Sequence, residues 1–391
     1  MRILLLLPLF LLSLLAYSQI DYNTSATVGA ERFDQYLEII SDKNVGIVAN
    51  QTSQVEGEHL VDILLDKGVT IKKVFAPEHG FRGTADAGEH IKSDTDEKTG
   101  LPIISLYGNN KKPTADQVND LDVILFDIQD VGVRYYTYIS TMHYVMEACA
   151  ENDILFIVLD RPNPNGFYVD GPVLEKGFES FVGLHPVPVV HGMTVGEYAQ
   201  MINGEGWLKA GISCELQVVK CTRYSHKDIY KLPVPPSPNL PNMAAVLLYP
   251  NLGFFEGTVV SVGRGTDRPF QIIGHPEYTA RGFSFTPKPT HGAKNPKHNG
   301  IRCYGHDLEG YAETLIPGVR GLYLNWLTEM YNNSVNKEDF FNNFFDNLAG
   351  TDKLRKQVIA RKSPDQIRSS WREDIRVYMQ TRAKYLLYND F

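Results

Sequence analysis

Cysteine is scarce in this chain, which limits what disulfides or metal clusters could contribute. Four cysteines occur among 391 residues, and none of them stands in a Cys-x-x-Cys pair. Such a count cannot supply a disulfide framework, and no metal-ligand spacing is present. Cys214 and Cys221 are the closest pair in sequence and could be bridged in an oxidising compartment. We nevertheless expect four buried thiols, at Cys149, Cys214, Cys221 and Cys303.

Positive charge is also in deficit. Lysine and arginine together number 38 against 46 aspartates and glutamates, which gives a formal net charge of −8. This balance argues against a nucleic-acid partner, because such proteins carry an excess of positive charge on the binding face. The length exceeds the usual size of a single hydrophobic core, so two domains are expected.

Several motifs of familiar enzyme classes are missing. The chain has no Gly-x-Ser-x-Gly elbow of an α/β-hydrolase and no His-Glu-x-x-His zinc motif. The turn after the first predicted strand, at 50–53, lacks the Gly-x-Gly-x-x-Gly pattern of dinucleotide-binding domains. Gly263-Arg264-Gly265 is not followed by the Lys-Ser/Thr pair of a P-loop. These four chemistries therefore find no support in the sequence.

One long apolar run is present, at the start of the chain. Arg2 precedes the apolar residues 4–16, and small residues follow at Ala16 and Ser18. A positive charge, a short apolar stretch and small residues are typical of a secretory signal peptide, whereas a membrane span needs about 20 apolar residues. We expect cleavage near Ser18 and export to the periplasm or the cell exterior. No cysteine stands directly after the expected cleavage site, which argues against a lipid anchor.

Short apolar segments alternate with helical patterns through the first part of the chain. Predicted strands lie at 45–49, 71–76, 103–107, 123–126, 155–159 and 216–220, and predicted helices at 60–64, 114–119, 142–150 and from a Thr194 N-cap onward. Continuous apolar strands separated by helices indicate a parallel sheet covered on both faces. A proline-rich stretch at 233–241 is either a domain connector or a rigid loop that lines a site. Helices are expected near 339–348 and 367–388.

Acidic side chains follow three of the predicted strands. They are Glu78, Asp127 with Asp130, and Asp160. Arginines stand close to them, at Arg82, Arg134 and Arg161. Because the carboxyl ends of parallel strands share one edge of a sheet, these groups should converge on one polar crevice. Each carboxylate could alternatively cap a helix or form a structural ion pair.

Other residues suit this crevice to a sugar. Tyr135, Tyr136 and Tyr138 can offer ring faces to a pyranose, or can simply pack in the turn. The segment 263–270 is bracketed by glycines and carries two arginines, an arrangement suited to holding an anion or to a tight turn.

Five motifs together resemble those of the bacterial exo-β-N-acetylmuramidase family. They are Ala76–Gly83, Phe126–Gly132, Asp160–Pro164, His191–Thr194 and Gly263–Thr266, in this order within 45–270. The resemblance implies a Rossmann-like, doubly wound α/β domain with a mostly parallel sheet, which we place at 19–243, and a smaller α+β C-terminal domain at 244–391 that closes the cleft. It further implies release of N-acetylmuramic acid (MurNAc) from the non-reducing end of β-1,4-linked MurNAc-GlcNAc peptidoglycan fragments, without a cofactor or metal.

The chemistry of glycoside hydrolysis suggests roles for the candidate residues. Glycoside hydrolysis needs an acid to protonate the leaving oxygen and a second group at the oxocarbenium-like centre, either a carboxylate or the substrate's own acetamide. Glu78 is the candidate acid, and Asp127, Asp130 and Glu175 are candidates for the second role. The lactyl carboxylate of MurNAc needs an arginine, with Arg264 and Arg82 favoured. Candidate substrate-binding residues are His79, Arg82, Arg134, Tyr136, Asp160, Arg161, Asn163, His191, Glu256, Arg264, Thr266 and Asp267.

Two other functions remain open at this stage. The same fold could bind a muropeptide sugar without cutting it. A metal-assisted phosphohydrolase could use Asp127, Asp130 and Asp160, although Asp127-Ile128-Gln129 lacks the Asp-x-Asp pair such enzymes often use.

Overall fold

The computed structural model describes residues 20–78, 80–82 and 94–391. The predicted signal peptide lies outside these residues. Within them, no helix combines the length and the apolar character that a membrane span requires. All four cysteines are buried free thiols, as expected.

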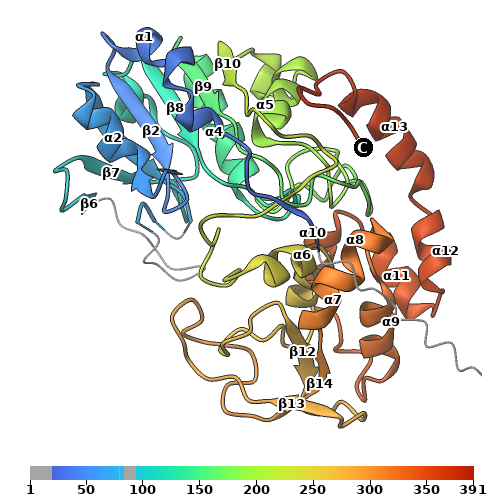
Figure 1. Ribbon diagram of the computed structural model, residues 1–391. Coiled ribbons are helices and arrows are strands. Elements are labelled where there is room, and N and C mark those ends of the chain that lie inside the picture. The colour runs from blue at the N-terminus through green and yellow to red at the C-terminus, as the bar shows by residue number, and fades with distance from the viewer. Residues whose placement is uncertain (1–19, 79, 83–93) are drawn as a thin grey trace, which may run out of the picture.

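A seven-stranded sheet forms the first domain (Figure 1). Its strands, in order across the sheet, are β10 (Leu216–Val219), β9 (Leu155–Leu159), β8 (Val123–Asp127), β2 (Val45–Ala49), β5 (Ile71–Ala76), β7 (Pro102–Ser105) and β6 (Asp94–Thr95). All neighbouring pairs are parallel except β6 and β7. The chain builds outward from β2 in one direction and then returns to the other side of β2, so the sheet is doubly wound.

Each face of the sheet packs against its own helices, because side chains alternate along a strand. On β8, Ile124 and Phe126 join a core with α3 (Ala115–Val118), α4 (Tyr138–Glu151) and α5 (Val195–Gly204). Val123 and Leu125 face the opposite core, with α1 (Leu37–Ile40) and α2 (Leu60–Asp66). The prediction of a parallel sheet covered on both faces is confirmed.

The C-terminal part is smaller and mixes helices with an antiparallel sheet. The sheet has the order β12 (Ile272–His275), β14 (Cys303–Asp307), β13 (Phe283–Phe285). The helices are α6 (Met243–Leu252), α7 (Glu309–Thr314), α8 (Ile316–Val319), α9 (Asn325–Asn332), α10 (Phe344–Ala349), α11 (Lys353–Ile359), α12 (Pro364–Ser369) and α13 (Arg372–Arg382). Two short pairings complete the strands, β1 (Tyr22–Asn23) with β11 (Ile229–Tyr230) and β3 (Gln54–Val55) with β4 (Glu58–His59).

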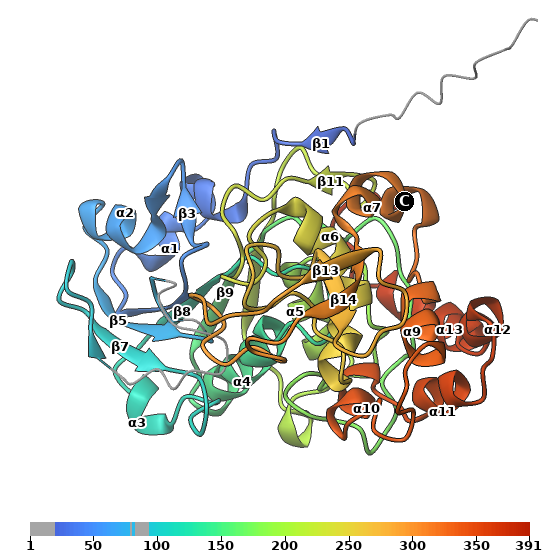
Figure 2. The same ribbon diagram turned by 90° about the horizontal axis from the view of Figure 1, so that it is seen from below.

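The two parts share one hydrophobic core. The cluster that contains Phe126 on β8 continues without a break to Leu247 on α6 and Trp326 on α9. Figure 2 shows the first-domain strands on one side and the C-terminal helices α9 to α13 on the other. The continuous core holds the cleft between them in a fixed geometry.

The last residues of the chain return to the first domain. Tyr388 donates its hydroxyl to Asp160 Oδ2 at 2.5 Å, and Leu387 N donates to Glu197 Oε1 at 2.8 Å. Figure 1 shows α13 running back toward α5. The C-terminal tail therefore closes a second connection between the two parts, beyond the covalent one.

The helix start that was predicted from a capping motif is confirmed. Thr194 accepts a hydrogen bond from Glu197 N and forms the predicted capping box at the start of α5. The helix expected near 339–348 begins only at Phe344. The helix expected over 367–388 is instead two helices, α12 and α13. Trp371 separates them, because its indole is buried and donates to Asp170 Oδ1 at 2.8 Å.

Candidate active site

A pocket of about 220 Å³ lies where the carboxyl edge of the sheet meets the C-terminal part. Glu78 follows β5, Tyr107 follows β7, and residues 135–138 lead into α4. The opposite wall comes from the proline-rich segment, the loop at 253–270 and Phe344. Typical pockets for drug-sized ligands measure about 300–1,000 Å³, so this one suits a single sugar ring.

Glu78 forms one wall of the pocket. It stands two residues beyond the end of β5 and is half-buried. Thr137 Oγ1 donates to Glu78 Oε2 at 3.3 Å. Burial, and then the negative charge of Glu78 and a hydrogen bond to it, raise the pKa of Tyr107 to about 12. Gly80 adopts a positive φ of 78° just after it, a conformation that glycine allows without strain.

Glu256 and Arg264 form the opposite wall. Arg264 Nε donates to Glu256 Oε1 at 2.7 Å, and Nη2 donates to Oε2 at 3.1 Å. Burial alone would lower the pKa of Arg264, but the adjacent Glu256 carboxylate raises it, so the guanidinium stays charged. Its carbon Cζ lies 5.1 Å from the centre of the Phe270 ring. The remaining nitrogen, Nη1, has no hydrogen-bond partner among the described residues.

The glycines beside Arg264 are needed for this turn. Gly263 and Gly265 have φ values of 77° and 81°. A Cβ on Gly263 would lie 2.6 Å from Ile272 Cγ1, and one on Gly265 would lie 2.6 Å from Lys288 O. The glycine-bracketed loop predicted from the sequence is thus a tight turn that also presents Arg264 to the pocket.

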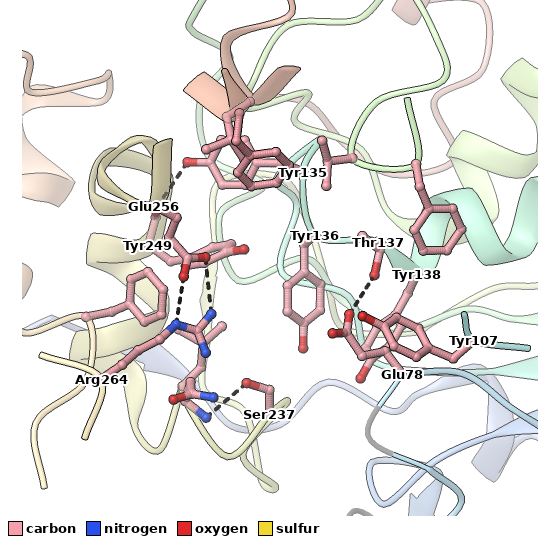
Figure 3. Close-up of a pocket in the computed structure, with 17 residues that line it drawn as sticks. Glu78, Tyr107, Tyr135, Tyr136, Thr137, Tyr138, Ser237, Tyr249, Glu256 and Arg264 are labelled. Atoms are coloured by element: carbon pink, nitrogen blue, oxygen red, sulfur yellow. Dashed lines mark hydrogen bonds and ion pairs between the residues drawn. The ribbon is translucent and has the colours of Figure 1, made fainter. Parts of the chain in front are cut away.

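Tyr136 stands between the two walls (Figure 3). Its hydroxyl donates to Pro236 O at 2.8 Å, and its ring meets those of Tyr138 and Tyr249 edge-on. Tyr135 also lines the pocket, with its hydroxyl donating to Pro250 O at 2.7 Å. These bonds fix the rings, so the tyrosines both pack the turn and present an aromatic floor.

The proline-rich segment is a rigid loop that lines the site. Ser237, Asn239 and Leu240 all face the pocket. Asn239 Nδ2 donates to Gly292 O at 2.7 Å, which ties this loop to the C-terminal part. Of the two roles the sequence left open for this segment, it fulfils the second.

Asp127 and Asp160 lie at the same sheet edge but outside the pocket. Asp127 is fully buried and accepts two hydrogen bonds from Arg161, Nε–Oδ1 at 2.6 Å and Nη2–Oδ2 at 2.9 Å. Asp160 accepts from Gly196 N at 2.8 Å and from Thr194 Oγ1 at 2.7 Å. The first is a structural ion pair, and the second anchors the start of α5.

The other two candidate carboxylates do not line the pocket either. Asp130 is buried, and its Oδ1 accepts from Gly132 N at 2.7 Å. Burial raises the pKa of Asp130 to about 7. Glu175 lies elsewhere and pairs with Lys353 Nζ at 2.9 Å and Thr351 Oγ1 at 2.9 Å.

The candidate substrate-binding residues divide in the same way. Tyr136, Glu256 and Arg264 line the pocket. The remaining described candidates lie outside the pocket. Arg82 pairs with Asp62 and Asp96, and Arg134 donates to three buried carbonyls. Asn163 and His191 are buried in turns, Thr266 donates to Gly263 O, and Asp267 is exposed. His79 lies outside the described residues.

Several lining residues were not named as candidates from the sequence. They are Tyr107, Phe181, Asn239, Tyr249 and Phe344. Tyr107 could have been found, because it is the last residue of the strand predicted at 103–107 and so lies at the same edge of the sheet as Glu78. Phe344 belongs to the C-terminal part, where no motif indicated which side chains face the cleft.

This fold and site define a two-domain α/β protein with a small, carboxylate-bearing pocket at the sheet's carboxyl edge. The family models described as Exo-beta-N-acetylmuramidase NamZ, N-terminal and C-terminal, match residues 45–244 and 247–388. The chain therefore belongs to the exo-β-N-acetylmuramidase family.

Known relatives agree over nearly the whole length. The chain is 39% identical over 382 residues to the peptidoglycan beta-N-acetylmuramidase NamZ of Bacillus subtilis (strain 168), covering 90% of this chain and 89% of that protein. Two crystal structures of DUF1343 family proteins from Bacteroides fragilis NCTC 9343 share the fold. One has a TM-score of 0.88 and 44% identity, over 94% of this chain and 100% of that one. The other has a TM-score of 0.78 and 30% identity, over 93% and 99%.

Proposed function

We propose that the protein is an exo-acting glycoside hydrolase that releases MurNAc from the non-reducing end of β-1,4-linked MurNAc-GlcNAc fragments of peptidoglycan. Its family membership and its 39% identity to a peptidoglycan beta-N-acetylmuramidase support this activity. The observation that carries the proposal is the placement of Glu78 in a one-sugar pocket, facing the Glu256–Arg264 pair across Tyr136 (Figure 3).

Glu78 is the proposed general acid. Its carboxyl group would protonate the glycosidic oxygen as the bond to the leaving GlcNAc breaks. Thr137 donates to one of its oxygens, Oε2, and so fixes the orientation of the carboxyl group. Tyr107, whose raised pKa keeps its phenol protonated, supports the same group from the side of β7.

The second catalytic role falls to Glu256 or to the acetamide of the substrate. Glu256 is the other carboxylate that lines the pocket among the described residues. Arg264 donates to both of its oxygens and so fixes the carboxylate in the pocket wall, as preorganised stabilisation of an oxocarbenium-like centre requires. If the acetamide is the attacking group, Glu256 and Arg264 serve to position the sugar instead.

Arg264 is the proposed partner of the lactyl carboxylate, the group that distinguishes MurNAc from GlcNAc. Glu256 holds its Nε and Nη2, and Nη1 has no hydrogen-bond partner among the described residues, so Nη1 would be the atom that meets the carboxylate. A guanidinium fixed in this way meets a carboxylate with little loss of conformational freedom.

The proposal extends to the place where the enzyme acts. The N-terminal signal pattern and the peptidoglycan substrate both favour export to the periplasm or the exterior, with cleavage near Ser18. Mass spectrometry of the mature protein would find an N-terminus close to Gln19. An intact cytoplasmic chain that begins at Met1 would contradict export.

A chromogenic β-MurNAc glycoside tests the activity directly. Turnover that is unchanged by a chelator supports the glycosidase. Turnover that disappears with the chelator would point to a metal-dependent reaction. No turnover, together with saturable binding of the sugar, would make the protein a binder rather than an enzyme.

A further inference from the structure

A lysine stands over an aromatic ring that lines the pocket. Phe181 lines the pocket and is half-buried, unlike the deeply buried tyrosines of the floor. Lys111 Nζ lies over the Phe181 ring, 4.6 Å from its centre. The Tyr144 ring runs nearly parallel to that of Phe181, with an angle of 13° between their planes. The aromatic pair thus holds the ammonium group in place.

The neighbouring lysine shows what is unusual about Lys111. Lys112 Nζ forms ion pairs with Glu147 at 3.1 Å and Glu151 at 2.7 Å, both on α4. For Lys111, no carboxylate lies within ion-pair distance among the described residues, and its positive charge meets only the ring of Phe181. Beside Phe181 the pocket therefore carries a positive charge that has no carboxylate partner among the described residues.

The proposed substrate carries anionic groups beyond its terminal MurNAc. The pocket of about 220 Å³ is smaller than usual sites for drug-sized ligands, so sugars beyond the terminal MurNAc would lie outside it. In an alternating MurNAc-GlcNAc chain, the next MurNAc carries another lactyl carboxylate, and attached stem peptides carry carboxylates of their own. The protein has a net charge of −8, so a positive side chain beside the pocket favours an anionic saccharide against this background.

We propose that Lys111, held over Phe181, binds a substrate carboxylate that lies outside the MurNAc pocket. This inference rests on the proposed function and adds a specificity site for longer or peptide-bearing fragments. The ammonium group favours fragments with a second carboxylate over small MurNAc glycosides that lack one. Phe181 acts as a positioning residue, because it fixes the ammonium rather than touching the reacting atoms.

The test compares kcat/KM for three substrates: a chromogenic MurNAc glycoside, the peptide-free tetrasaccharide MurNAc-GlcNAc-MurNAc-GlcNAc, and the same tetrasaccharide with a stem peptide on its inner MurNAc, so that the terminal lactyl carboxylate stays free in all three. Lys111→Met keeps the aliphatic packing over Phe181 and removes the charge, whereas Lys111→Arg retains the charge. Lys67→Met is the matched control, because Lys67 Nζ lies 4.5 Å from the centre of the Phe33 ring in the same kind of contact, away from the pocket.

We expect Lys111→Met to lower kcat/KM for the peptide-free or the peptide-bearing tetrasaccharide about two- to fivefold relative to the chromogenic glycoside. The substrate that loses identifies which carboxylate is bound. The loss should shrink between about 0.02 M and about 0.5 M ionic strength, since salt screens an exposed charge. Lys111→Arg should restore the ratio, and Lys67→Met should leave it unchanged.

Equal ratios for the parent and Lys111→Met on both larger substrates would overturn the proposal, as would a loss that Lys67→Met reproduces. Turnover of the chromogenic glycoside by the parent is measured in the same series. Its absence would refute the proposed function itself, so the two failures are distinguishable.

Discussion

Arg264 and Glu256 meet through two parallel hydrogen bonds, of 2.7 Å and 3.1 Å, on the wall of the pocket that faces Glu78. This pairing leaves one end of the guanidinium available to a ligand and fixes its direction. Recognition of the lactyl carboxylate therefore depends on a preformed arginine rather than on one recruited by the substrate.

Replacement of Arg264 should erase much of the preference for MurNAc. We expect Arg264→Ala to cost about 2–4 kcal/mol of transition-state binding on a MurNAc glycoside, and less on the GlcNAc analogue, which lacks the carboxylate. The measurement is the ratio of kcat/KM values for the two glycosides. Arg82→Ala serves as the control, because Arg82 pairs with Asp62 and Asp96 outside the pocket. A variant at 264 that prefers MurNAc as strongly as the parent would refute this role.

Asp127 should matter for stability more than for chemistry. Its pair with Arg161 is buried on both sides, so Asp127→Asn leaves an uncompensated guanidinium in the interior. Breaking such a pair typically costs about 3–5 kcal/mol of unfolding free energy. Urea unfolding measures the loss, and turnover per folded molecule should stay close to that of the parent. Unchanged stability with abolished turnover would instead make Asp127 catalytic.

Asp130 makes a pH-dependent prediction. Burial raises its pKa to about 7 in the folded protein, above the value of about 3.9 for an exposed aspartate. Between these values the unfolded chain releases the proton first, so this group's contribution to stability is full below about pH 4 and falls as the pH rises toward 7. Asp130→Asn removes this loss and can still accept from Gly132 N.

The gain in unfolding free energy from Asp130→Asn over the parent should therefore grow from pH 5 to pH 8, to about 2–4 kcal/mol. Denaturant unfolding at the two pH values checks it. A gain that does not vary with pH would show that Asp130 titrates normally.

The sheet could be predicted because its strands are continuous apolar runs. Val123 to Phe126 reads as a buried strand, and the β-α alternation then predicts a parallel sheet covered on both faces. The doubly wound arrangement was implied by the family resemblance. The same rule correctly placed Glu78 at the carboxyl edge. The break between α12 and α13 was not readable, because it depends on a long-range contact between Trp371 and Asp170.

The site was harder to predict because proximity to the sheet edge is not the same as facing the pocket. Asp127 and Asp160 stand at the same edge as Glu78, yet each is turned to a partner, Arg161 or the start of α5. A carboxylate that ends a strand has the same sequence signature whether it binds a ligand or an arginine. Residues such as Phe344 reach the pocket only through the packing of the C-terminal part.

The central claim is that Glu78 protonates the leaving group, and one comparison tests it most directly. Glu78→Gln cannot donate that proton but keeps a similar shape. The measurement is kcat/KM of this variant on the natural disaccharide MurNAc-GlcNAc and on a MurNAc glycoside with a phenolic leaving group that departs without protonation. Our account predicts near-complete loss on the disaccharide and much greater retention on the phenolic substrate. An equal loss on both substrates would contradict it.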